Sequence, residues 1–446
     1  MTLFQGLFQP DHLSWIMAGL IILVMITVYG FSKRYMMGDR YYQGHLKNIL
    51  FLTVSLLVMV FADNLLILLG AWTLSNLVLA RLMIHKKEWV AARASGILAL
   101  KTLGIGIVLL AIGFYLLIDI TGTFSLHTLL SNSNAQPSAK LTIALTLIFI
   151  AAMTQSAIYP FHRWLISSLN SPTPVSALMH AGLVNGGGFL LIRFAPLYLS
   201  KPFLLHVIFI AGLITVILGT FWKLIQTDIK RMLACSTMGQ MGFMVMECGM
   251  GLFPLALSHL VWHGLFKAYL FLGSGAVAQE KLRNNHFGRT TVLSFILAAI
   301  FGLIGAYVFA LTARNIFSLE NTSIIMLGLA FMTCTQFACN FLEANITLVK
   351  VILAILASVL SGLFYGASIF VIDYLLAALN LFQPQALDAI YTSGFAVIFL
   401  IWICLNLNIS ERLQKTTLWQ RLYMSALNSS QPNASTITAN RTDYQF

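Results

Sequence analysis

The feature that most constrains the fold is the recurrence, along the whole chain, of apolar stretches of about 18 or more residues, each long enough to span a bilayer as a helix. Of the 446 residues, 59% are hydrophobic and only 9% are charged. A soluble domain of this size could not cover its surface with so few charged side chains. The sequence therefore predicts an all-α fold, a polytopic transmembrane helix bundle.

Thirteen spans are predicted, and together they form a single integral membrane domain over residues 1–425. They lie near residues 12–31, 46–61, 64–84, 96–118, 141–158, 165–199, 203–222, 232–249, 252–276, 291–313, 322–342, 346–370 and 389–408. Residues 426–446 form a polar cytoplasmic tail rich in Asn, Ser and Thr, which we expect to be irregular. Its aromatic end, TDYQF, could alternatively be a docking peptide.

The formal net charge of +12 is explained by topology. If the spans alternate in direction, most basic residues fall on one side of the membrane: Lys33, Arg34, Arg40, Lys47, Arg81, Lys86, Lys87, Arg93, Arg163, Lys223, Lys230, Arg231, Lys281, Arg283, Arg289, Arg412, Lys415 and Arg421. The positive-inside rule makes that side cytoplasmic, with a periplasmic N-terminus and a cytoplasmic C-terminus in a bacterial inner membrane. Lipid is thus the expected surroundings, and no nucleic-acid partner is predicted. The five cysteines form no CxxC pair, so neither a disulfide nor a metal site is indicated.

One predicted span, SHLVWHGLFKAYLFLGSG, carries three ionisable side chains. His259, His263 and Lys267 are spaced four residues apart, so they drift only about 80° around a helix and share one face. A lysine near the middle of a span costs roughly 2.5–3.5 kcal/mol on insertion scales. Lys267 could snorkel to the interface, but it lies deep between apolar flanks, and we predict an intramembrane path for protons or cations.

A second region, from Ala152 to Pro196, predicts a broken helix. Pro172 and Pro174 remove backbone donors, and the glycines at 186–188 allow either a second irregular stretch or a close approach between helices. Broken helices at membrane depth are tolerated where protein or a water-filled cavity satisfies the backbone, and transporters place ion sites there. His180 lies between the two breaks as a candidate proton relay, although a hydrogen-bonded packing histidine is equally compatible with the sequence.

The segment DIKRMLACSTMGQMGFM begins a later span. Asp228, Lys230 and Arg231 lie at its cytoplasmic start, where anchoring is the simpler interpretation and entry of ions through Lys230 is the alternative. Glu247, near the opposite end of the span, is a candidate exit group. Three further candidates each have an interfacial alternative: Lys101, Glu343 and Lys350.

The block from Met153 to Gly275 resembles the antiporter-like, proton-conducting subunits of respiratory complex I and of multisubunit cation/proton antiporters. The resemblance is carried by SPTPVSALMHAGLV, DIKRMLACSTMGQMGF and HLVWHGLFKAYLFLGSG, with ADNLLILLGAW upstream in agreement, and it covers roughly residues 50–280. It implies an antiporter-like fold with discontinuous helices. It also implies that five residues match the family's proton path: His180, Lys230, His259, His263 and Lys267.

Two positions depart from that family's pattern. After the tryptophan of LLGAW the family carries an intramembrane glutamate, and this chain has Thr73. In the broken-helix region the family carries a lysine, and this chain has Gln155. The glutamate–lysine pair thought to drive the family's charge switching is missing, and the chain lacks the long lateral helix of the largest complex I subunit. The missing charged pair and the missing lateral helix both argue against a working proton-pumping subunit of complex I.

One branch of the family fits better. The strings PFHRWLISSLNSPTPVSALMHAGLVNGGGF and ALNSSQPNASTITANRTDYQF resemble the membrane subunit of the two-component DAB inorganic-carbon transporters. The resemblance implies a large peripheral partner with a zinc site like that of β-carbonic anhydrases. It further implies that flow of H+ or Na+ through this chain drives hydration of CO2 to bicarbonate in the partner. The chain itself is then a transporter subunit rather than an enzyme, without a cofactor of its own, and zinc is expected in the partner.

Two alternatives stay open. The chain could be a proton-pumping subunit of a respiratory NADH dehydrogenase or of a cation/proton antiporter. It could instead be a membrane scaffold that recruits a soluble enzyme without conducting ions, as Thr73 and Gln155 would allow. Retention of three aligned ionisable groups in one span argues against the scaffold, because a scaffold gains nothing from their insertion cost.

Overall fold

The structure, a computed structural model, describes residues 6–131, 138–275, 291–313, 318–342, 346–407 and 416–437. Within these ranges the chain is almost entirely helical, and extended segments meet only as isolated bridges. The predicted all-α class is therefore confirmed. The candidate residue Glu343 and the aromatic end of the tail lie outside the described residues.

Ten helices in the described ranges are long and apolar enough to cross a membrane. They are α1 (His12–Tyr35), α2 (Tyr42–Phe61), α3 (Leu65–Met83), α4 (Val90–Thr121), the composite Thr173–Arg193, α11 (Pro202–Ile225), α13 (Phe253–Gly273), α14 (Val292–Thr312), α16 with its 3-10 extension (Leu348–Leu379) and α17 (Ala389–Asn406). Two shorter apolar helices are α6 (Ala139–Gln155) and α15 (Ser323–Cys339), and the more polar α12 spans Ile229–Gly249. Each predicted span thus corresponds to a helix or, for 165–199, to a series of short helices.

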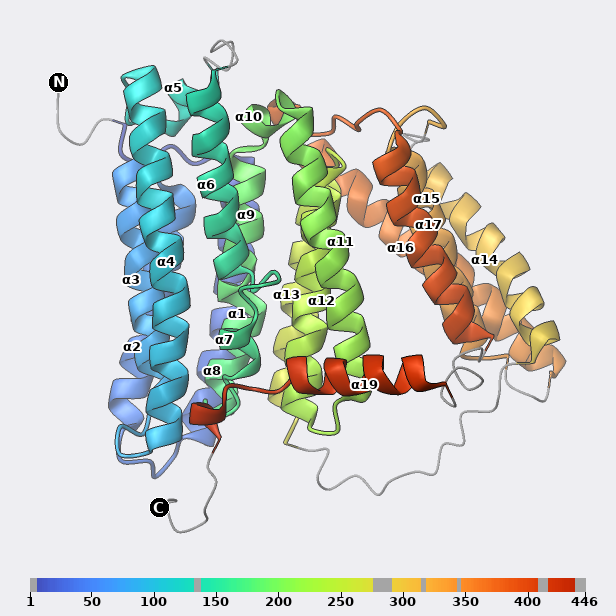
Figure 1. Ribbon diagram of the computed structural model, residues 1–446, viewed down its shortest axis with the longest axis horizontal. Helices are drawn as coiled ribbons and strands as arrows, with labels where there is room; N and C mark the ends of the chain where they lie inside the picture. The colour runs from blue at the N-terminus through green and yellow to red at the C-terminus, as the bar shows by residue number, and fades with distance from the viewer. Residues whose placement is uncertain are drawn as a thin grey trace. The chain divides into compact units, whose positions relative to one another are not determined.

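By its internal packing the chain divides into two compact units. Unit 1 comprises Met1–Gly249, His259–Val277 and Leu427–Phe446, and unit 2 comprises Met250–Ser258 and Ala278–Ala426. Helix α13 therefore begins in unit 2 and continues in unit 1. In Figure 1 the spanning helices of unit 1 run from blue to yellow-green, and those that lie wholly in unit 2 are yellow to orange-red. The five principal candidate residues all belong to unit 1.

The predicted discontinuous region consists of short helical pieces in unit 1. They are α7 (Arg163–Ile166), α8 (Thr173–Leu178), the π-helical turn η1 (Met179–Leu183), α9 (Asn185–Arg193) and α10 (Ala195–Leu199). Pro174 lies in the first turn of α8, where a missing N–H leaves no helical hydrogen bond unmade. The first predicted break is thus the start of α8. A second irregularity is the π-helical turn, which precedes the glycines at 186–188, and such turns often mark functional sites.

The glycines at 186–188 are helical and serve close packing. A Cβ built on Gly187 would lie 2.3 Å from Ser156 Oγ and 2.4 Å from Ala152 O. Only a glycine lets α9 approach the end of α6 so closely. Ser156 Oγ then donates a hydrogen bond to Val184 O at 2.6 Å, which joins the end of α6 to the residue that follows the π-helical turn.

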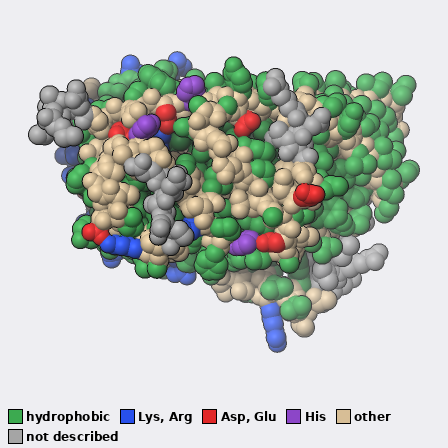
Figure 2. Space-filling model, turned by 90° about the horizontal axis from the view of Figure 1, so that it is seen from above, with side chains coloured by type: hydrophobic (Ala, Val, Ile, Leu, Met, Phe, Trp, Pro, Cys, Tyr) green, Lys and Arg blue, Asp and Glu red, His purple; other side chains and the backbone are tan. Residues whose placement is uncertain are grey.

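Large hydrophobic side chains are exposed along the spanning helices, as lipid-facing surfaces require. Examples are Trp15 and Ile26 on α1 and Tyr115 on α4. The sides of these helices are therefore suited to lipid rather than to water. Figure 2 looks down on the ends of the helices, where Asp, Glu, His, Lys and Arg side chains appear among hydrophobic ones.

In its described part, up to residue 437, the tail contains helical segments where we expected irregular chain. The boundary at 426 falls inside α19 (Thr417–Ser429), and residues after it dock on unit 1. Asn433 N donates to Ser167 Oγ at 2.9 Å, and Asn170 Nδ2 donates to Thr436 O at 2.7 Å. We call Ser430–Thr436 the docked segment; it lies against the turn that leads into the broken helix.

Candidate ion-conducting site

Helix α13 buries a lysine well inside a membrane span. Lys267 is 1% exposed and His263 is also buried, whereas His259 keeps part of its ring accessible. The four-residue spacing brings the three side chains to one face of the helix, as predicted. Between them, Gly264 allows α13 to lie close to the π-helical turn, because a Cβ there would be 2.9 Å from Ala181 O.

A chain of hydrogen bonds joins Lys267 to His180 through helix α12. Lys267 Nζ donates to Leu233 O at 3.3 Å, and Thr237 Oγ1 donates to the same carbonyl at 3.0 Å. Thr237 Oγ1 also lies 3.1 Å from His180 Nδ1. Because the hydroxyl proton is directed at Leu233 O, the hydroxyl oxygen accepts from His180 Nδ1. Two buried ionisable groups from different helices are thus linked through one carbonyl and one hydroxyl.

His259 lies beside a buried carboxylate. Its Nδ1 is 3.2 Å from Glu247 Oε2, and Glu247 is 0% exposed. Its Nε2 is 2.9 Å from Gln240 Oε1. Both partners belong to α12. The candidate Glu247 therefore lies beside His259, one of the principal candidates.

His263 is placed between these two arrangements. Its ring centroid is 6.4 Å from that of His259, and it lies one helical turn from Lys267. Neither of its ring nitrogens has a hydrogen-bond partner among the described residues. A buried imidazole in this state has a free lone pair that can accept a proton.

Lys230 lies at the other end of α12, in the turn that the positive-inside rule makes cytoplasmic. Its Nζ donates to Ser171 O at 3.3 Å, immediately before α8. Asp228 acts instead as a helix cap, because its Oδ1 accepts from Arg231 N at 2.8 Å. The structure thus brings Lys230 to the start of the broken helix and gives Asp228 a structural task.

Two other candidates do not join this group. Lys101 is exposed on α4, and Lys350 lies in the first turn of α16 in unit 2. Among the residues that the structure describes, no group of three or more His, Cys, Asp or Glu is arranged to hold a metal ion.

The two positions that depart from the family pattern are both polar and uncharged. Thr73 Oγ1 donates to Leu69 O of its own helix at 2.8 Å. Gln155 and Asn76 exchange two amide hydrogen bonds of 3.1 Å each, and Gln155 Nε2 also donates to Leu183 O at 3.3 Å. A neutral amide pair therefore ties α3 to the end of α6, and Gln155 connects both to the π-helical turn. The sequence offered no signal for Asn76, because its partner is distant in the chain.

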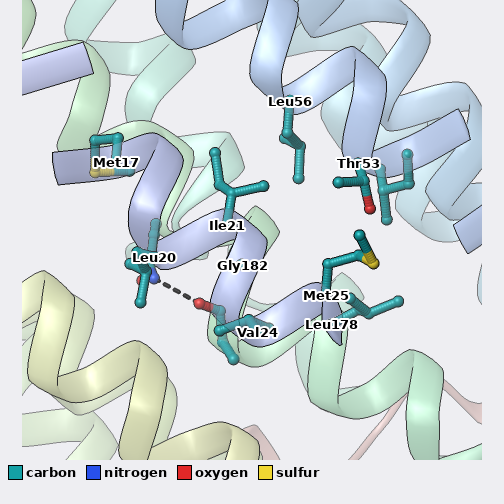
Figure 3. A pocket seen from close by; sticks show the side chains of 12 residues that line it. Met17, Leu20, Ile21, Val24, Met25, Thr53, Leu56, Leu178 and Gly182 are labelled. Carbon is teal, nitrogen blue, oxygen red and sulfur yellow. Dashed lines mark hydrogen bonds between the residues drawn. The ribbon is translucent and has the colours of Figure 1, made fainter. Parts of the chain in front are cut away.

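A small cavity of about 20 Å³ opens beside the π-helical turn (Figure 3). Apolar side chains of α1 and α2, such as Ile21 and Leu56, form much of its wall, together with Leu178 and Gly182 of the broken helix. Asn185 also lines it and anchors its Nδ2 on Ala181 O at 2.7 Å. The volume suffices for about one water molecule.

A buried charge that the sequence reasoning missed closes the opposite end of the broken helix. Arg193, 7% exposed, pairs with Asp11 and donates to Ser14 Oγ at 2.8 Å and to Val60 O at 3.3 Å. The string LLIRFAP could have signalled it, because an arginine within an apolar stretch needs a buried partner.

These features define a class of protein: a membrane helix bundle with a π-interrupted broken helix and a row of buried basic groups beside it. The chain belongs to the family described as "NADH:quinone oxidoreductase/Mrp antiporter, TM", which matches residues 62–293. The predicted resemblance to antiporter-like subunits is therefore confirmed.

Relatives come from both predicted branches of the family. The chain is 39% identical to the "Probable inorganic carbon transporter subunit DabB1" of Halothiobacillus neapolitanus, over 66% of this chain and 53% of that protein. It is 37% identical to the corresponding DabB of Bacillus anthracis, over 62% and 54% respectively. It is also 37% identical to the chloroplastic NAD(P)H-quinone oxidoreductase subunit 5 of Nymphaea alba, over 60% of this chain and 37% of that protein. The chain spans about half the length of the DabB relatives it matches.

The fold is also found in a solved structure. The Mrp complex from Dietzia sp. DQ12-45-1b contains a chain that superimposes with a TM-score of 0.65 at 22% identity, over 96% of this chain and 53% of that one. The antiporter-like fold is thereby shown for nearly the whole chain.

Proposed function

We propose that this chain is the membrane subunit of an energy-coupled inorganic carbon uptake complex. In this proposal it conducts H+ or Na+, and the flow drives hydration of CO2 in a large peripheral, zinc-containing partner that resembles β-carbonic anhydrases. The observation that carries the proposal is the buried chain from His180 through Thr237 and Leu233 O to Lys267. The identity to the DabB subunits favours inorganic carbon as the cargo.

The path would run the length of unit 1. With a periplasmic N-terminus and a cytoplasmic C-terminus, His259 lies nearest the periplasm and Lys230 nearest the cytoplasm, with Lys267 and His180 between them. Each of these groups exists in a charged and a neutral form, so a proton can be passed along them in steps. A non-conducting scaffold would carry the insertion cost of Lys267, about 2.5–3.5 kcal/mol, without return.

A second candidate function is a subunit of a respiratory NADH dehydrogenase or a cation/proton antiporter. The identity to the Nymphaea alba oxidoreductase subunit favours it. Thr73 and Gln155 argue against it, because two neutral side chains cannot switch charge where that family uses a glutamate and a lysine. In the leading proposal, catalysis takes place in the partner, and this chain transports the ion.

The first test is growth rescue of a bacterium that lacks carbonic anhydrase, in ambient air. The chain is expressed with and without a gene for the proposed large partner, and with and without an uncoupler. Rescue that needs both genes and is abolished by the uncoupler supports the proposal. No rescue by a well-expressed pair would favour the respiratory or antiporter function, and rescue that survives the uncoupler would favour the scaffold.

The same assay tests the path. Lys267→Ala should abolish rescue while membrane insertion stays intact, and Thr237→Val should weaken it strongly because the isosteric change removes the hydroxyl that joins His180 to Leu233 O. Thr335→Val is the matched control, since Thr335 is buried in unit 2 and its hydroxyl donates only within its own helix, to Phe331 O at 2.8 Å. Normal rescue by Lys267→Ala would refute the path.

A further inference from the structure

Glu247 is a buried carboxylate, whereas the five principal residues of the proposed path are basic. Its position beside His259 gives it a specific role. The inference rests on the proposed function, since it concerns how the ion enters that path. Glu247 and Gln240 lie seven residues apart on α12, so they fall on one face of the helix, two turns apart. His259 of α13 is placed between them.

Both ring nitrogens of His259 face acceptor oxygens. Nε2 is in hydrogen-bond contact with Gln240 Oε1 at 2.9 Å, and Nδ1 lies 3.2 Å from Glu247 Oε2, within ion-pair distance. A neutral imidazole carries one N–H and can satisfy only one of these acceptors, whereas the imidazolium carries two. A buried carboxylate also requires a compensating positive charge. The arrangement therefore fits a protonated His259 paired with an ionised Glu247.

The neighbouring histidine, His263, is placed to accept a proton rather than to donate one. His263 is buried, and neither of its ring nitrogens has a partner among the described residues. The charged and aromatic groups around His259 are Glu247 and Phe243 from α12, with His263 on its own helix. A proton donor and a proton acceptor thus lie one helical turn apart.

We propose that Glu247 is the counter-ion of His259, and that this pair is the proton-loading site at the periplasmic end of the path. In the transfer step an N–H bond of His259 breaks and an N–H bond forms on His263, whose ring lone pair accepts the proton. The centroids are 6.4 Å apart, a gap that a ring rotation or one bridging water closes. Glu247 keeps its negative charge throughout and draws the next proton onto the neutral His259.

The loading site distinguishes H+ from Na+. A hard cation such as Na+ needs several oxygen ligands around one point. Glu247 Oε2 lies 3.2 Å from an imidazole nitrogen, a group that binds a proton rather than a hard cation. The pair therefore loads a proton, and the proposed transport is H+-coupled.

The test measures the protonation state of the histidines in the full chain, purified in lipid with its partner, at neutral pH. Nitrogen-15 NMR of labelled imidazoles separates imidazolium from neutral rings. We expect one buried imidazolium signal that disappears in His259→Gln, and we expect Glu247→Gln to convert that ring to the neutral form. Glu247→Asp, which keeps the charge, should retain the imidazolium signal.

Absence of the His259-dependent imidazolium signal in the unsubstituted protein would overturn the inference, even if Glu247→Gln failed to fold. An unchanged signal in folded Glu247→Gln would do the same. The matched control is Glu88→Gln, the same change at an exposed loop carboxylate that accepts from Tyr41 Oη at 2.8 Å, and it should leave the signal unaltered.

The growth assay separates this inference from the proposed function. Glu247→Gln should reduce bicarbonate uptake by about tenfold or more, the scale of a lost proton-transfer group, and replacing NaCl by KCl should change nothing. If Glu247→Gln shows normal uptake and Lys267→Ala shows none, the proposed path stands but Glu247 is not part of it. Normal uptake in both variants would remove the path itself, and uptake that requires Na+ would refute proton loading.

Discussion

At the scale of single residues, Lys267 and His180 are joined through an uncharged side chain, that of Thr237. Lys267 stands out because a lysine inside an apolar stretch is rare. Thr237 carries no such signal, since a threonine in a helix usually donates to its own backbone, as this one does to Leu233 O. Its second contact, with His180, depends on where the broken helix lies.

The ion pair of Arg193 and Asp11 gives a prediction about stability. Burial opposes the ionised carboxylate, but the adjacent Arg193 charge and hydrogen bonds from Arg193 and Ser14 outweigh that effect and lower the pKa of Asp11 below its usual 3.8. Asp11→Asn should destabilise unit 1 by about 3 kcal/mol, because Arg193 is left buried without its counter-charge. A thermal-unfolding series in detergent measures it.

The pH dependence of this contribution has a definite sign. Since the pKa of Asp11 is lower in the folded protein, the stabilisation is fully present above the unfolded value and is lost only as pH falls through the folded one. The difference between the protein and Asp11→Asn should therefore stay constant near neutrality and shrink in acid below about pH 4. The control is Asp119→Asn, because Asp119 and Lys140 form an exposed pair worth less than about 1 kcal/mol. Equal losses in the two variants would contradict the prediction.

At the scale of helices, the spans and the first break were predictable, because apolar length and proline act locally. The glycines at 186–188 left two interpretations open, irregular backbone or a close approach between helices, and the structure shows the close approach. The same ambiguity applies to α11 and α12, whose glycines could have indicated either flexibility or packing. Tertiary contact decides between the two, and a sequence does not show it.

The contact between α11 and α12 gives a sharp test. A Cβ on Gly219 would lie 2.5 Å from Gly239 N, which is backbone and cannot move aside. Gly219→Ala should therefore separate the two helices and reduce the yield of folded protein severely, although alanine favours helix. The measurement is monodispersity and thermal stability after extraction in mild detergent.

Gly104→Ala is the matched control for that substitution. Gly104 lies within α4, and nothing comes within 4 Å of a Cβ built there. Alanine at this position should be neutral or stabilising by roughly 0.5–1 kcal/mol. If both variants behave alike, the close packing of α11 and α12 is wrong.

At the scale of the whole molecule, the sequence predicted one membrane domain, and the structure resolves two compact units that share helix α13. Hydropathy reports how many helices there are but not how they are grouped, because every spanning helix is apolar towards lipid and protein alike. The family match was more informative than hydropathy about this division. It covers residues 62–293 and ends near the start of α14, the first helix that lies wholly in unit 2.

The proposed orientation can be tested with reporter fusions. Alkaline phosphatase inserted after Ser131, between α5 (Leu126–Ser131) and α6, should be active because the positive-inside rule places that loop in the periplasm. The same insertion between His85 and Trp89, in a basic loop, should be inactive. A fluorescent protein fused after Phe446 should fluoresce, as it does only in the cytoplasm. The reverse pattern would invert the direction of the whole path.

The docked segment has a consequence for biosynthesis. Residues Ser430–Thr436 leave the ribosome after every spanning helix described here, yet they bond to Ser167 and Asn170 at the mouth of the broken helix. During translation Ser167 and Asn170 therefore lack these two hydrogen-bond partners until the last spanning helix has been synthesised. Unit 1 is completed only when the end of the chain returns to it.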